Sequence, residues 1–286
     1  MKNGKKVRLS RSLGGNISIN LMLAAFGAVM FLPMLYSVSS ALKPLEELWI
    51  FPPRFLARNP TLQNFTDLLR LLNDSWVPFT RYLFNTLFVA VVGTAGNVVL
   101  GSMCAFAMSK MEFPGRKVLF QLAVLSLMFT SSVTGIPNFI ILSKLGWINS
   151  YWALIIPTFS SSLGLYLMKQ FMESMLPDTV LESAKIDGAG DMTTFWRIVM
   201  PIVKPAWLTL IIFSFQGLWN MGSTIYIYSE KLKPLNYALQ QILSAGVSRQ
   251  GAAAAAAVIM MIVPILVFVF TQSNVVETMA TSGMKD

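Results

Sequence analysis

Six long stretches without a single Asp, Glu, Lys or Arg constrain this chain more than any other feature. They cover residues 12–42, 82–109, 118–143, 145–168, 205–229 and 250–276. A helix needs about 20 predominantly apolar residues to cross the hydrocarbon core of a bilayer, and each stretch is longer than that. A core helix of a soluble protein would be shorter and would carry charges on its outer face. The pattern therefore predicts an integral membrane protein.

The expected fold class is all-α, a polytopic bundle of six transmembrane helices within a single domain that covers residues 1–286. The spans are predicted at about 17–42, 82–108, 118–142, 151–168, 206–228 and 252–272. In the second span, Gly93, Gly96 and Gly101 would allow close contact between helices. The charged segment between the fourth and fifth spans, residues 169–204, overlaps the loop 176–205 analysed below.

The distribution of basic residues predicts the orientation. The net charge is +9, and hydrophobic residues make up 55% of the chain against 12% charged residues. Basic residues gather before the first span, at Lys2, Lys5, Lys6, Arg8 and Arg11, and again in the short loop 110–117, whereas only Lys144 lies between spans three and four. Because cytoplasmic loops carry the excess of Lys and Arg, both termini are expected inside. The positive charge is therefore attributed to membrane topology and not to nucleic-acid binding.

The absence of certain residue types restricts the functions that this chain can have. There is no His, and the lone Cys104 leaves no disulfide and no metal cluster within this chain. No Asp or Glu lies inside a predicted span, which leaves little for an intramembrane enzyme and disfavours the alternative of an ion-driven secondary transporter. The chain also lacks the Gly-x-x-x-x-Gly-Lys-Ser/Thr phosphate loop, so we expect no ATPase site and no bound cofactor.

The loop 176–205 contains the signals of two short helices. Thr179 and Glu182 have the spacing of a capping box, and Gly188 is placed to end the helix that they begin. A second helix is expected to start near Asp191 and to continue to Pro201. Helices of two to three turns are marginal alone, so both need tertiary contacts.

The first of these helices combines small, apolar and charged side chains. The small ones are Ser183, Ala184 and Gly188, the apolar ones are Val180, Leu181 and Ile186, and the charged ones are Glu182, Lys185 and Asp187. Small residues let another surface approach the backbone, while the apolar and charged residues can supply contacts. Spacing alone leaves two interpretations open, a docking site for another protein and an ordinary loop with two capped turns.

The loop resembles a family signature. The pattern Glu182-Ser183-Ala184, three residues, Gly188, nine residues and Ile198-Val199-Met200-Pro201 is similar to the signature loop of ABC-importer permeases, with Ser183 in place of Ala and Met200 in place of Leu. Further similarity to the maltose-type carbohydrate permeases lies at 51–53, 59–65, 85–86, 113–117, 143–146, 151–154 and 215–220. Residues 228–235 are most similar to the polysaccharide-fragment permeases of Gram-positive bacteria. Family members often carry an acidic residue after Asn220, where this chain has Met221-Gly222.

The resemblance implies one subunit of an importer in the bacterial plasma membrane. Its implied partners are a second related permease, two copies of a cytoplasmic ABC ATPase that bind ATP and Mg, an extracytoplasmic solute-binding protein and membrane lipid. The solute would be an oligosaccharide or a polysaccharide fragment. The short helix would be the cytoplasmic coupling helix that docks on the ATPase. Its expected contacts are Leu181, Glu182, Ser183, Ala184, Ile186, Asp187 and Gly188.

A neutral sugar needs hydrogen-bonding groups and aromatic faces along its path. Candidates for such a path are Asn85, Asn138, Gln216, Trp219 and Asn220, and Asn97 is a further candidate. Polar side chains within a membrane tend to face a cavity or the interior of the bundle. The alternative for each of them is an interhelical hydrogen bond that serves structure alone.

Overall fold

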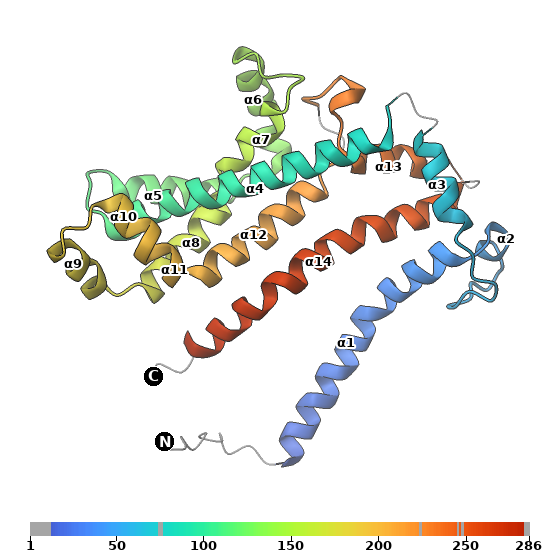
Figure 1. Ribbon diagram of the computed structural model, residues 1–286, viewed down its shortest axis with the longest axis horizontal. Coiled ribbons are helices and arrows are strands. Elements are labelled where there is room, and N and C mark those ends of the chain that lie inside the picture. The colour runs from blue at the N-terminus through green and yellow to red at the C-terminus, as the bar shows by residue number, and fades with distance from the viewer. Residues whose placement is uncertain (1–12, 74–76, 223–224, 245, 247–248, 283–286) are drawn as a thin grey trace. The chain divides into compact units, whose positions relative to one another are not determined.

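The computed structural model describes residues 13–73, 77–222, 225–244, 246 and 249–282 (Figure 1). Within these ranges every regular element is a helix, as the sequence predicts. The chain divides into two compact units, one of residues 1–68 with 245–258 and one of residues 69–244 with 259–286. The basic residues 2–11, on which the orientation partly depends, lie outside the described residues.

The first unit is held together around a buried asparagine. It contains α1 (Leu13–Leu42), α2 (Leu45–Leu48), the start of α3 (Gln63–Asn73) and the first turns of α14 (Gln250–Ser282). The Asn64 side chain donates to the carbonyls of Ala41 and Lys43 at 2.8 and 2.7 Å, which satisfies acceptors at the end of α1. A Cβ atom at Gly251 would collide with the Asn64 amide, so α14 approaches here closely.

The second unit is built around α4 (Phe79–Lys110), and the helices that pack on it are α7 (Trp152–Phe159), α8 (Ser162–Met175) and α12 (Lys204–Trp219) (Figure 1). The predicted close contact of α4 is confirmed at two glycines. A Cβ atom at Gly96 would overlap the ring of Phe159, and one at Gly93 would lie 2.7 Å from Leu218 Cδ1.

Two apolar clusters fill the spaces around α4. The one towards the C-terminal end of α4 contains Val98, Ala105, Phe106, Met168, Met172, Leu176, Phe195, Val199, Val203, Ala206 and Leu210. The one towards its N-terminal end contains Val89, Ala90, Leu154, Ile155, Phe215, Leu218, Trp219 and Ile227. These side chains fix the positions of α7, α8 and α12 along α4.

Two of the expected spans are interrupted. The segment expected as one helix over 118–142 consists of α5 (Arg116–Ser126) and α6 (Ser131–Lys144), and α5 ends in a tight turn with an extended Thr130 after it. The segment expected over 151–168 breaks between α7 and α8. The Ser161 hydroxyl accepts a hydrogen bond from the Gly164 N–H at 3.1 Å, so it caps a new helix.

The helix expected over 206–228 is shorter than predicted. The observed helix, α12, ends at Trp219. Asn149 supplies partners for the backbone beyond it. Its side-chain oxygen accepts from the N–H groups of Tyr228 and Ser229 at 3.1 and 2.8 Å, and its own N–H donates to Tyr226 O at 2.8 Å. Backbone groups satisfied in this way do not need a helix. The chain continues through η2 (Glu230–Leu232) and α13 (Leu235–Ser244).

The loop between α8 and α12 forms the two expected short helical segments. They are α9 (Asp178–Ile186), followed by α10 (Asp191–Thr194), the π-helix η1 (Phe195–Val199) and α11 (Met200–Ile202). The chain bends by 81° between the 191–202 segment and α12.

Three of the described helices are long and apolar enough to cross a membrane, and the bent pair 191–202 and 204–219 is a further candidate. The three lie at Gly14–Leu42, Phe79–Lys110 and Gln250–Gln272, close to the first, second and sixth predicted spans. A crossing made of two short helices does not meet this length criterion, so the count of six spans stays a prediction.

Gly96→Val should destabilise the packing of α4 against α7. The added methyl groups would overlap the Phe159 ring, and overpacking of this kind costs about 1–3 kcal/mol. Gly27→Val in α1 is the matched control, since no neighbour lies within 4 Å of a Cβ atom there. Thermal unfolding of the purified protein should show a lower midpoint for Gly96→Val alone, and equal midpoints for the two variants would contradict this packing.

Candidate functional site

Helix α9 ends in a Schellman motif built on Gly188. The Ala189 N–H donates to Ala184 O at 2.9 Å, and the Gly188 N–H donates to Lys185 O at 3.0 Å. Gly188 has φ +75°, a conformation that costs a residue with a Cβ atom about 1–2 kcal/mol. The predicted role of Gly188 as the helix terminator is therefore confirmed.

The predicted start of α9 is wrong. The residue at the N-cap position is Pro177, with φ −65° and ψ 141°, and it makes no side-chain cap hydrogen bond. Its fixed φ lets the helix begin at Asp178, which puts Thr179 inside the first turn. Thr179 is therefore not the N-cap residue, and the capping box with Glu182 does not form. The Thr179 carbonyl accepts a hydrogen bond from the Ser183 hydroxyl at 2.9 Å.

One face of α9 is fixed to the rest of its own unit. Ala184 is only 5% exposed, and Leu181 packs against the apolar cluster that contains Phe106 and Phe195. The Lys110 ammonium forms an ion pair of 2.6 Å with the Asp178 carboxylate. Lys110 is the last residue of α4, so α9 is tied to the end of the central helix (Figure 1). Among the predicted contact residues, Ala184 and Leu181 therefore support α9 from within the chain.

The other predicted contact residues are exposed. We call them the outer face of α9, and they are Glu182, Ser183, Ile186, Asp187 and Gly188. Ile186 is 86% exposed, although it is a large apolar side chain at the end of a helix whose opposite side is buried. The outer face combines an apolar centre with polar and acidic neighbours, which is the composition of a protein contact with a polar rim.

A cavity of about 540 Å³ lies beside α9, between this helix, α10 and the end of α4. Its lining is mostly polar and contains both acidic and basic side chains, which are those of Glu112, Asp178, Glu182, Asp191, Lys110 and Lys185.

Asn85, a candidate for the solute path, is engaged within the protein. It is 1% exposed, its amide nitrogen donates to Lys231 O and Lys233 O at 2.9 Å each, and its oxygen accepts from the Tyr151 hydroxyl at 2.7 Å. Next to it, the Thr86 hydroxyl accepts from the Leu235 N–H at 2.7 Å. These contacts hold residues 230–235 on the start of α4 and favour the structural interpretation of Asn85.

An ion pair lies within the segment 230–235 that packs on the start of α4. Lys233 lies 2.7 Å from the Glu230 carboxylate and donates to the Tyr237 hydroxyl at 2.6 Å. Burial alone would lower the pKa of Lys233, but these hydrogen bonds outweigh it and raise the pKa above its usual value. Lys233 therefore stays charged, and Glu230 also accepts from the Tyr82 hydroxyl at 2.8 Å.

The remaining path candidates separate into buried and exposed groups. Trp219 is fully buried, stacks on Phe215 and donates to Met260 O at 3.0 Å, so it also belongs to the structure of the bundle. Asn138, Gln216 and Asn220 are exposed. Asn97 is 4% exposed and donates to the Ser214 hydroxyl at 3.0 Å. Only the exposed three retain side chains that are open to a solute.

The sequence did not identify the residues that fix the site in place. The ion pair of Lys110 with Asp178 joins residues 68 positions apart, and the role of Asn149 depends on contacts with residues 79 and 80 positions away. Lys110 was visible only as one basic residue of an inner loop. Asn149 has a positive φ of 60°, a conformation that Asn adopts more readily than most residues. The residue type therefore indicates a turn at this position but not the contacts that the side chain makes.

The apolar helices and the outer face of α9 together describe a helical membrane protein that exposes one short helix. Residues 97–280 match the family described as the inner membrane component of binding-protein-dependent transport systems. The match covers more than half of the chain, so the protein belongs to this family of transport permeases.

Two relatives and one solved structure show how far the similarity extends. The polygalacturonan/rhamnogalacturonan transport system permease protein YtcP of Bacillus subtilis is 30% identical over 80% of this chain and 78% of its own length. Protein LplC of the same organism is 32% identical over 78% of this chain and 73% of its own. A bacterial ABC transporter involved in alginate import has a chain that matches with TM-score 0.75 at 22% identity, over 90% of this chain and 95% of its own. That likeness supports the fold.

Asn85→Ala should destabilise the second unit rather than weaken solute binding. It would leave the carbonyls of Lys231 and Lys233 and the Tyr151 hydroxyl without their partner, at a cost of about 1–3 kcal/mol. Asn138→Ala, at an exposed position, is the matched control and should leave the unfolding midpoint unchanged. A normal midpoint for Asn85→Ala together with a raised KM for uptake would show that Asn85 contacts the solute.

Proposed function

We propose that this protein is the permease subunit of an ATP-binding-cassette importer that passes an oligosaccharide or a polysaccharide fragment inward across the plasma membrane. The outer face of α9 docks on an ATPase subunit that binds ATP and Mg, and this chain itself binds neither. Its other partners are a second related permease, a second ATPase copy and an extracytoplasmic solute-binding protein. Both termini lie in the cytoplasm.

The observation that carries this proposal is the two-sided character of α9. Its inner side is buried through Ala184, Leu181 and the ion pair of Lys110 with Asp178, while Ile186 stands 86% exposed on the outer side. A short helix is marginal in isolation, so the inner contacts are needed to present the outer face in one orientation. An apolar side chain that is held out in this way is suited to a pocket on a partner protein.

The relatives support the solute class. The matched permease of Bacillus subtilis is described as serving polygalacturonan and rhamnogalacturonan, and the structural match belongs to an importer of the polysaccharide alginate. The exposed amides of Asn138, Gln216 and Asn220 offer donors and acceptors that suit sugar hydroxyls. We therefore place a sugar oligomer, and not an inorganic ion, on the transport path.

The docking of α9 predicts the effect of a charge at its apolar centre. Ile186→Glu should reduce the amount of ATPase that copurifies with this chain by about tenfold or more, because an unpaired charge would be buried in the contact. The fold should be unaffected, since the side chain is exposed. The measurement is the stoichiometry of subunits in the transporter purified through a tag on this chain.

Ile225→Glu is the matched control for that variant. Ile225 is 59% exposed and lies between α12 and η2, far along the chain from α9, so the same substitution there should leave the ATPase bound. Equal ATPase recovery from wild type and Ile186→Glu would overturn the proposed docking surface.

The terminating glycine provides a second test of α9. Gly188→Ala should cost about 1–2 kcal/mol at the helix end, displace the outer face and lower uptake several-fold while membrane insertion remains normal. Gly190→Ala is the control, since Gly190 has φ −71° and no atom within 4 Å of a Cβ position. Full uptake by Gly188→Ala would mean that the shape of this turn does not matter for coupling.

The solute class is tested by uptake. The transporter, purified from its host and reconstituted in liposomes with its binding protein outside, should accumulate labelled oligogalacturonides when ATP is supplied inside. The Ile186→Glu assembly should accumulate none. Uptake of sn-glycerol 3-phosphate without uptake of any oligosaccharide would contradict the proposed solute while leaving the docking surface intact.

A further inference from the structure

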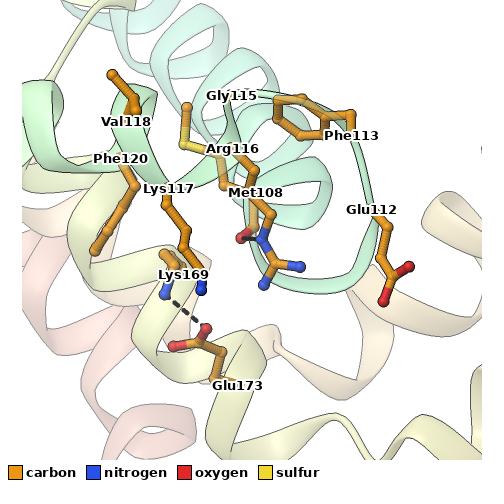
Figure 2. Close-up of a pocket in the computed structure, with 10 residues that line it drawn as sticks. All are labelled: Met108, Glu112, Phe113, Gly115, Arg116, Lys117, Val118, Phe120, Lys169 and Glu173. Atoms are coloured by element: carbon orange, nitrogen blue, oxygen red, sulfur yellow. Dashed lines mark hydrogen bonds and ion pairs between the residues drawn. The ribbon is translucent and has the colours of Figure 1, made fainter.

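A second cavity lies at the same end of α4 as α9, on another side of the helix. Its volume is about 650 Å³, and it is enclosed by the end of α4, the turn 111–115, the start of α5 and the last turns of α8 (Figure 2). Glu112 lines this cavity and also the one beside α9. The cavity is therefore placed at the membrane surface on which the ATPase is proposed to dock.

Basic groups gather on one side of this cavity. Figure 2 shows the Lys117 and Lys169 side chains converging there, with the Glu112 carboxylate on the opposite side. Lys169 is buried, with its ammonium 2.6 Å from Glu173 and 4.2 Å from the centre of the Phe120 ring. Lys117 is exposed and forms no ion pair among the described residues.

The third basic residue, Arg116, is held in place by the backbone. Its guanidinium donates to the carbonyls of Met108, Ser109 and Met111 at 2.7, 2.9 and 3.1 Å, which caps the C-terminal end of α4. The lining thus contains three basic and two acidic side chains, a net charge of one positive. That charge is complementary to a single phosphodiester.

An apolar surface continues from the cavity along α5. Val118 lines the cavity and is 58% exposed, and Leu122 and Leu125, four and seven residues further on, are 56% and 50% exposed. This spacing places them on one face of the helix, which extends about 10 Å from the cavity at 1.5 Å per residue. A charged cavity that opens onto an apolar helix face matches the two parts of a phospholipid.

We propose that this cavity binds the phosphate headgroup of an anionic phospholipid, with Lys117 as the accessible contact and with the acyl chains along Val118, Leu122 and Leu125. Basic pockets between transmembrane helices on the cytoplasmic side are suited to such headgroups. A soluble phosphate would be attracted by the same basic groups but would gain nothing from the α5 face, so the apolar surface favours the lipid. The inference requires the membrane placement of α4 and is independent of the solute.

The test measures lipid retention by the intact transporter. Purified from nanodiscs that contain equal amounts of phosphatidylglycerol and phosphatidylcholine, the wild type should retain phosphatidylglycerol in native mass spectrometry. Lys117→Glu should reduce the retained phosphatidylglycerol about fivefold or more, and Lys117→Arg should keep it. Lys144→Glu makes the same charge change at the exposed last residue of α6 and should also keep it.

Three results would overturn the proposal. Equal phosphatidylglycerol retention by Lys117→Glu and wild type would exclude Lys117 as the contact. Equal retention of phosphatidylglycerol and phosphatidylcholine by the wild type would exclude a site for an anionic headgroup. Thermal stabilisation by millimolar inorganic phosphate that Lys117→Glu abolishes, with no phosphatidylglycerol retained, would identify a site for a soluble anion instead. Neither measurement needs transport or ATP hydrolysis, so failure here is distinguishable from failure of the proposed function.

Discussion

Close packing against α4 is the constraint on which the second unit depends. In a bilayer the lipid tails are as apolar as the side chains, so helices associate through tight contact and internal hydrogen bonds. Gly93 and Gly96 remove side-chain volume where α12 and α7 approach, and the buried polar groups of Asn85 and Thr86 receive hydrogen-bond partners. These two kinds of contact explain how short helices such as α7 and α8 keep fixed positions beside one long helix.

The long helices could be predicted because their signal is local. The uncharged runs near residues 17–42, 82–108 and 252–272 correspond to α1, α4 and α14, and Gly188 ends α9 as expected. The interruptions could not be predicted in the same way. The backbone at residues 226–229, beyond the end of α12, is held by Asn149, which is distant in sequence, and the start of α8 is capped by a serine hydroxyl within an apolar run. Hydropathy does not distinguish a continuous helix from two helices of the same composition.

The candidate site shows the same division between local pattern and spatial arrangement. The pattern placed Leu181, Ala184 and Ile186 on one short helix, but it did not say which of them would face the protein. Ala184 is buried and Ile186 is exposed because α9 packs through Leu181 on the apolar cluster of Phe106 and Phe195, with the ion pair of Lys110 and Asp178 at its start. For the polar residues of the spans, the sequence left two interpretations open, and contacts with residues 230–235 favour the structural one at Asn85.

The length of α4 has a mechanical consequence. Lys110 at one end holds α9, and Asn85, 25 residues earlier, holds the segment before α13. At 1.5 Å per residue the two attachments are roughly 38 Å apart on one uninterrupted helix. No break in the helix separates the two attachments, so one continuous element joins α9 to the segment before α13. Helices α7, α8 and α12 pack along α4 between these points, so a displacement at either attachment is transmitted through the whole second unit and not absorbed at a hinge.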